Sequence, residues 1–161
     1  MTKATEALSD LVQYSAWASQ KLLTFAQTVP EDVIARAIPN SHGGILKTFQ
    51  HIYYADRVWL SRLEQAVVAF EDPPPGPSLA QLDRAWWPLL DRLAAFADGN
   101  DPDANLAFQR TNGDTHSLQI GPLLRHIVNH GTYHRGQIAS MLRESGFVPP
   151  STDLLYYHLK I

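Results

Sequence analysis

Residues 122–145, with the sequence PLLRHIVNHGTYHRGQIASMLRES, carry the strongest structural signal in the chain. Apolar side chains recur along them at steps of three and four residues, which predicts a helix with one face against a core. Pro122 suits the first turn of such a helix, and Gly146 suits the position just after its end. We therefore predict a long amphipathic helix here.

Three further amphipathic stretches lie upstream, and each ends where Pro and Gly gather. They cover residues 5–29, residues 45–69 and the segment from Ser78, a suitable N-cap, to the break that begins at Asp98. Pro88 lies inside the last of these and predicts a kink or a one-turn offset. Helices of roughly 20 residues are about 30 Å long, the dimensions of a four-helix bundle. The expected fold is therefore an all-α four-helix bundle, as a single domain over residues 1–161.

The pattern changes between the third and the fourth helical stretch. Short runs around Leu106 and Phe108 and around Leu118 and Ile120 alternate in polarity, with Asn-Gly at 112–113 between them. Asn-Gly between two alternating runs is a strong signal for a tight turn between antiparallel strands. We therefore predict a small β-hairpin before the last long helix, and a short turn or helix near residues 153–157.

The amino-acid composition excludes several classes of function. The chain has 161 residues, 13 Lys and Arg against 16 Asp and Glu, and no cysteine. The slightly acidic balance, without a basic run, argues against nucleic acid and anionic membranes as partners. The lack of cysteine excludes disulfides, iron–sulfur clusters and an intrinsic thiol nucleophile. No apolar stretch is long enough for a signal peptide or a membrane span, so the expected location is the cytoplasm.

Three histidines lie on the last helical stretch at intervals of four residues: His126, His130 and His134. Neighbouring members of this series are about 6 Å apart along the axis and can share one ion, whereas the outer two, about 12 Å apart, cannot. The apolar face of the helix places His130 and His134 toward the interior and His126 toward the outside. The inward pair is the candidate chelating pair.

Two imidazoles are too few for a stable zinc-like site, so a third ligand has to come from another helix. His51, in the middle of the second helical stretch, is the candidate, although it projects to the flank of the apolar face. Asp56 projects into the middle of that face, where an unpaired carboxylate is costly. It therefore needs a partner, such as an arginine, the N–H of a ligating imidazole, or a metal ion.

Purely structural roles are the alternatives to these metal-ligand assignments. The pair His130 and His134 can share a helix face by coincidence, and a lone histidine such as His42, His116 or His158 is more often a loop or surface residue. Glycines at 131 and 136 each cost about 1 kcal/mol inside a helix, which implies a closely packed backbone or ligand beside them. The four tryptophans are more often packing residues than substrate platforms.

Three segments together resemble the DinB/YfiT-like metalloenzyme family: HIVNHGTYHRGQI (126–138), YSAWA (14–18) and HIYYADRVW (51–59). The resemblance spans almost the whole chain. It implies an up-up-down-down bundle that binds a divalent ion, often nickel or zinc, through three histidines at one end. Carried over residue by residue, these ligands are His51, His130 and His134, whereas His126 is not a usual ligand.

The same resemblance implies a small-molecule partner. Members and relatives of the family transfer low-molecular-weight thiols or isomerise substrates with the help of a thiol, and homodimers are common among them. Nothing in the sequence identifies a thiol-binding pocket. Asp56 could orient a ligand or accept a proton, and Arg135 could bind an anionic group, with a solvated salt bridge as the alternative for Arg135.

The leading hypothesis is thus a metal-dependent enzyme, a thiol S-transferase or a hydrolase, that activates a water or a low-molecular-weight thiol. One alternative is a non-catalytic metal-binding stress-response module, in which the ion only stabilises the bundle. Another is a metal-free helical protein that dimerises through a seam of histidines. Three imidazoles suit nickel, zinc, iron and copper, so the identity of the metal stays open.

Overall fold

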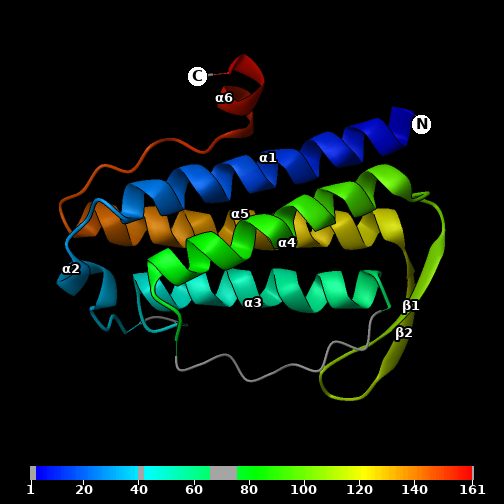
Figure 1. The fold of residues 1–161 in the computed structure, drawn as a ribbon, viewed down its shortest axis with the longest axis horizontal. Helices are drawn as coiled ribbons and strands as arrows, with labels where there is room; N and C mark the ends of the chain where they lie inside the picture. Colours follow the sequence, from blue (N-terminus) through cyan, green and yellow to red (C-terminus); the bar gives the residue numbers. More distant parts are fainter. Residues whose placement is uncertain (1–2, 40–41, 66–75, 161) are drawn as a thin grey trace.

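A computed structural model describes residues 3–39, 42–65 and 76–160. These residues form a helical bundle with one β-hairpin at its end, which confirms the predicted all-α fold (Figure 1). The elements in chain order are α1 (Lys3–Ala26), α2 (Glu31–Ala35), α3 (Ile45–Leu63), α4 (Leu79–Gly99), β1 (Asn105–Gln109), β2 (Thr115–Gln119), α5 (Ile120–Glu144) and α6 (Leu154–Leu159). No helix of the described ranges is both long and apolar enough to cross a membrane.

Local signals in the sequence fix several of these boundaries. Ser78 caps α4 in a capping box, because its hydroxyl accepts from the N–H of Gln81 and the Gln81 side chain accepts from the Ser78 N–H. Gly146 follows α5 with a φ of +89°, a left-handed conformation that suits glycine at a helix end. The hairpin turns at Gly113, which has a φ of +95°. Each of these features agrees with the sequence prediction.

The core lies between four long helices. α1 packs against α4 and α5, and α3 packs against the same two helices, so each long helix has two neighbours. Fully buried side chains from all four fill the centre, among them Leu22, Phe49, Trp86 and Ile138. Burial of such residues is the main driving force for assembling the bundle. α4 continues through Pro88 as one helix, and Trp86 lies in its buried face.

The directions of the helices differ from the up-up-down-down order that the resemblance implied. Arg36, just after α2, donates to Ser145 at the end of α5. Gln50, in the second turn of α3, donates to the carbonyl of Pro77, just before α4. The ends of α1 and α5 and the starts of α3 and α4 therefore share one end of the bundle, which gives an up-down-down-up order (Figure 1). The short α2 segment links α1 to α3 at that end, so no bundle-length connection is needed there.

Two more differences concern boundaries. α2 was not predicted, because its five residues are too few to show a helical period. α3 ends at Leu63, earlier than predicted, and Gln65 has a positive φ of 52° that is incompatible with a continuing helix. Predicted positions 66–69 lie outside the described residues.

Candidate metal centre

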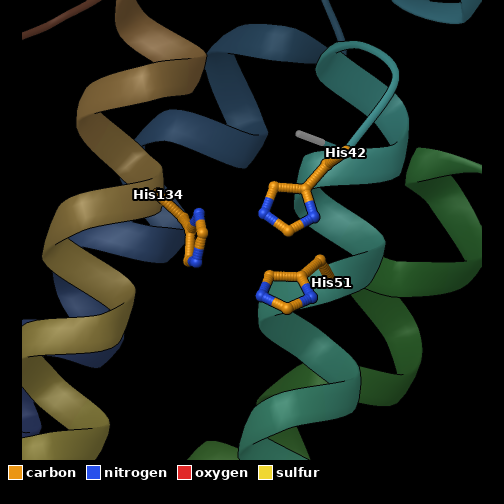
Figure 2. A group of neighbouring side chains, drawn as sticks. All are labelled: His42, His51 and His134. Carbon is orange, nitrogen blue, oxygen red and sulfur yellow. The ribbon is translucent and has the colours of Figure 1, made fainter. Parts of the chain in front are cut away.

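Four histidine rings from three parts of the chain meet between α3 and α5. His51 lies in the second turn of α3, His130 and His134 lie on α5, and His42 lies in the segment just before α3. Figure 2 shows that the rings of His42 and His51 are stacked on the α3 side and that His134 faces them from α5. Helices α3 and α5 are direct neighbours, which brings residues far apart in sequence together here.

The distances among these rings are short. One ligand atom each from His42, His51 and His134 can be chosen so that all lie within 4.8 Å of one another. His130 joins them because its Nε2 lies 3.0 Å from Nε2 of His51. The ring centroids of His130 and His134 are 4.4 Å apart, and those of His51 and His134 are 4.5 Å apart. The group whose ligand atoms all lie this close is thus His42, His51 and His134, and His130 adjoins it through its contact with His51.

Burial and mutual proximity lower the pKa values of His42, His51 and His130. Burial, followed by the charges of His42 and His134, lowers the pKa of His51 to about 4. Burial and the surrounding histidines, His134 foremost, lower the pKa of His130 to about 4. The pKa of His42 is lowered as well, through burial and His134. Neutral imidazole is the form that coordinates metal ions, so the folded protein holds these side chains ready to act as ligands near pH 7.

Gln137 orients the His134 ring. Nδ1 of His134 lies 2.7 Å from Oε1 of Gln137, one helical turn further along α5. An amide oxygen only accepts, so this contact is a hydrogen bond donated by Nδ1–H. The tautomer that makes it leaves Nε2 of His134 with a free lone pair, as in metal sites where a neighbour fixes the ligating ring.

The structure thus brings together the three residues that the sequence selected: His51, His130 and His134. Their assignment as the ligand set stays a prediction. His42, which the sequence pattern marked only as a loop or surface residue, is a further member of the cluster. It does lie in a loop, half-buried, but its ring centroid is only 4.0 Å from that of His51.

The signal for His42 was the pair of glycines that follows it. Gly43 and Gly44 have φ values of +81° and +128°, which residues with side chains rarely adopt. A Cβ on Gly44 would lie 2.5 Å from the carbonyl oxygen of Arg36. These two glycines allow the tight entry into α3 that turns His42 toward His51.

His126 lies outside the cluster, as predicted. Its side chain is exposed, and its ring centroid is 6.2 Å from that of His130. It also packs against the Trp59 ring of α3, at 5.1 Å. His126 therefore continues the row of rings along the surface between α3 and α5.

Asp56 does need a partner, and the structure shows which one. Its carboxylate is buried and accepts a 2.9 Å hydrogen bond from the indole N–H of Trp86 on α4. Burial raises the pKa of Asp56 to about 7, against the opposing effects of Trp86 and Arg135. A carboxyl group with this pKa can gain or lose a proton near neutrality. Its proposed role in accepting a proton stays a prediction.

Arg135 follows His134 in sequence but points to a different helix. Arg135 is 2% exposed, and its guanidinium donates to the hydroxyls of Ser15 and Ser19 on α1 and to that of Thr132. Gly131 makes room for it, because a Cβ there would lie 2.8 Å from Nη1 of Arg135. These contacts join α5 to α1. The prediction that Arg135 binds an anionic group is untested.

Gly131 is therefore closely packed, as predicted, but its neighbour is a side chain of the same helix and not a backbone or a ligand. At Gly136 a Cβ would meet no atom of the described residues within 4 Å. A second feature that the sequence did not indicate is Tyr54, one turn after His51. Its hydroxyl is buried without a hydrogen-bond partner in the described ranges, which is costly for a polar group.

Two comparisons with known proteins identify the family of this chain. Residues 1–160 match the DinB family. The chain is also similar to the protein named DinB from Bacillus subtilis (strain 168), with 26% identity over 156 residues that cover 91% of each chain. The match extends over the whole bundle, including the segments that carry His51, His130 and His134. The chain belongs to the DinB family.

Proposed function

We propose that this protein is a metal-dependent enzyme that acts on a small molecule by activating a water or a low-molecular-weight thiol. One observation carries the proposal: imidazoles from α3, α5 and the segment before α3 converge within a few ångströms of one another. Bringing several half-buried imidazoles so close has no evident benefit for packing. Neutral, closely spaced nitrogen donors are what a divalent transition metal ion requires.

The donor set fits such an ion. The atoms available to it are imidazole nitrogens, and those of His42, His51 and His134 lie within 4.8 Å of one another. A set of neutral nitrogen donors suits nickel, zinc or iron better than magnesium or calcium, which prefer oxygen. His51, His130 and His134 would hold the ion, and His42 is positioned to add a fourth nitrogen or to replace one of the others.

A divalent cation bound there would supply Lewis acidity that makes water or a thiol a nucleophile near neutral pH. The protein's own residues prepare this site. His51 and His130 are held neutral, and Gln137 fixes the orientation of His134. The chain has no cysteine, so any thiol has to come from the substrate. These features favour a thiol S-transferase or a hydrolase.

The metal is tested by elemental analysis of protein purified without a histidine tag. We expect about one equivalent of nickel, zinc or iron in the wild type and loss of most of it in His51→Ala and His130→Ala. His126→Ala, which removes the histidine one turn before His130 on α5, is the control and should keep its metal. Equal metal content in all four proteins would refute the proposed ligand set, and a metal-free wild type would favour the helical dimerisation protein.

The chemistry is tested by incubating metal-loaded protein with an electrophile and bacillithiol, mycothiol or glutathione. We expect acceleration with at least one thiol, and its loss in His130→Ala. If no thiol accelerates the reaction, ester and amide substrates test hydrolysis next. Inactivity on all of these, with metal bound, would favour the non-catalytic module. The homodimer that the family implies is checked by light scattering after gel filtration.

A further inference from the structure

A second site-like feature lies between the last turn of α3 and the hairpin. It is a cavity of about 490 Å³ with an aromatic wall formed by Trp59 and Phe108, whose ring centroids are 5.4 Å apart. Three basic side chains, Arg62, Arg110 and His116, line the rest of it together with polar residues. The metal centre described above uses none of these residues.

The charges in this cavity are not balanced. Among the described residues that line it there is no carboxylate. Burial and the nearby Arg110 lower the pKa of Arg62, which means that the two guanidinium groups repel each other. The guanidinium carbon of Arg62 lies 4.8 Å from the centre of the Trp59 ring, a cation–π contact that offsets part of this cost. An anion between the two arginines would remove the repulsion.

A row of rings connects the cavity to the histidine cluster. Trp59, in the cavity wall, packs against His126 at 5.1 Å. His126 is 6.2 Å from His130, whose Nε2 is 3.0 Å from His51. Along α3, Trp59 follows His51 by eight residues, which corresponds to about 12 Å. A small molecule of about this length can reach from the cavity to the cluster.

We propose that this cavity, which we call the basic pocket, binds the carboxylate or phosphate of an elongated small-molecule substrate whose other end lies at the histidine cluster. Arg62 and Arg110 hold the oxyanion, while Trp59 and Phe108 contact its apolar part. His126 then lines the path between the two ends. This inference rests on the proposed function, since it needs a reactive centre at the cluster, but anion binding itself does not need the metal.

The first experiment measures anion binding to the metal-free protein. Inorganic phosphate and phenylacetate are titrated separately while the indole N–H signal of Trp59 is followed by NMR. We expect a saturable shift with at least one of them. The anion with the higher affinity shows whether the pocket prefers a phosphate or a carboxylate. Arg110→Gln, a change at an exposed hairpin position, should weaken this binding about tenfold or more, because a charge-assisted hydrogen bond is lost.

Arg84→Gln is the matched control, since it removes the same charge from an exposed position on α4. It should leave the anion affinity unchanged. Absence of a saturable shift with both anions, or equal affinities in Arg110→Gln and Arg84→Gln, would overturn the basic pocket. Because these measurements use metal-free protein, their failure is separate from failure of the metal centre.

The second experiment tests the span between the two sites. Calorimetry on metal-loaded protein compares glutathione, a thiol with carboxylates, with 2-mercaptoethanol, a thiol without them. Arg110→Gln should weaken glutathione binding about tenfold, leave 2-mercaptoethanol binding unchanged and retain the wild-type metal content. A lack of glutathione binding to the wild type, or equal effects of Arg110→Gln on both thiols, would refute the span.

Discussion

Two consecutive residues of α5, His134 and Arg135, are both buried but face different neighbours. His134 faces α3 and joins the cluster of imidazole rings there. Arg135 faces α1, where the hydroxyls of Ser15 and Ser19 accept its hydrogen bonds, and it also donates to Thr132 of its own helix. One helix thus presents a possible metal ligand on one side and, on the other, a guanidinium whose Nη1 and Nη2 are hydrogen-bonded within the fold. Burial alone does not distinguish a binding residue from a packing residue.

The largest expected effect separates these two residues directly. His134→Ala should lower the metal affinity at least about a hundredfold, because a ligand is lost, and lower the stability of the metal-free protein by only about 1 kcal/mol, because the hydrogen bond lost within the fold is the one to Gln137. Arg135→Ala should do the reverse. It should keep the metal and lower the free energy of unfolding by about 2–4 kcal/mol, through lost hydrogen bonds and a cavity.

Metal titration and urea unfolding of both variants check this contrast. A large loss of metal affinity in Arg135→Ala, with stability unchanged, would contradict it. It would instead support the predicted role of Arg135 in binding an anionic group at the centre.

A second prediction concerns Asp56, which is buried on the packing side of α3 and yet titrates. Its pKa is raised in the folded state to about 7, so the folded protein holds a proton there that the unfolded chain releases above pH 4. Its contribution to stability is therefore greatest at low pH and is lost as the pH rises toward 7 and above. Relative to Asp56→Asn, the wild type should lose roughly 2–3 kcal/mol between pH 5 and pH 8.

Urea unfolding of the two proteins at pH 5 and pH 8 measures that difference. The comparison with Asp56→Asn is needed because His51 and His130, whose pKa values are lowered, act in the opposite direction and stabilise the fold as the pH rises from about 4 to 6.5. Parallel pH profiles for the wild type and the variant would show that Asp56 is ionised in both the folded and the unfolded state.

A third, smaller effect is expected at Gln137, which lies behind the ligand side of α5. Gln137→Leu removes the acceptor for Nδ1 of His134 and leaves that ring free to change its tautomer. We expect a loss of about tenfold in metal affinity, with little change in the stability of the metal-free protein. Gln137→Glu, which keeps an acceptor, is the control. Similar affinities for Gln137→Leu and the wild type would show that packing alone orients His134.

The smallest effect compares the two glycines of α5. Gly136→Ala should stabilise the protein by about 1 kcal/mol, since alanine favours the helix and its Cβ meets open space. Gly131→Ala should not stabilise the protein, because the added Cβ would displace the Arg135 guanidinium from Ser15. Thermal unfolding of both variants gives the comparison. Equal stabilisation by both changes would mean that the contact between α5 and α1 tolerates a shift of Arg135.

Much of the fold could be predicted because it depends on local patterns. The apolar period of α5, the capping residue Ser78 and the turn at Gly113 each determine their own element. The order of helix directions could not be predicted in this way, since it depends on which helix ends meet in space. Contacts such as that between Arg36 and Ser145 join residues more than a hundred positions apart.

The residues of the candidate metal centre likewise fall into those that local sequence patterns predicted and those that they did not. His130 and His134 follow from helical spacing alone, and the family resemblance was needed to select His51 over its unfavourable projection. The partner of Asp56 could not be predicted, because Trp86 lies on a third helix whose rotation depends on the whole core. His42 was missed because no helical period reaches a loop residue.

The placement of His42 has a consequence for how this centre can diversify. Three of the four rings are carried by long helices, so moving any of them disturbs the bundle. The fourth is attached to a short entry segment whose path depends on two glycines. Exchanging that segment alone can therefore add or remove a nitrogen ligand. This would change which cation binds best without altering the four long helices.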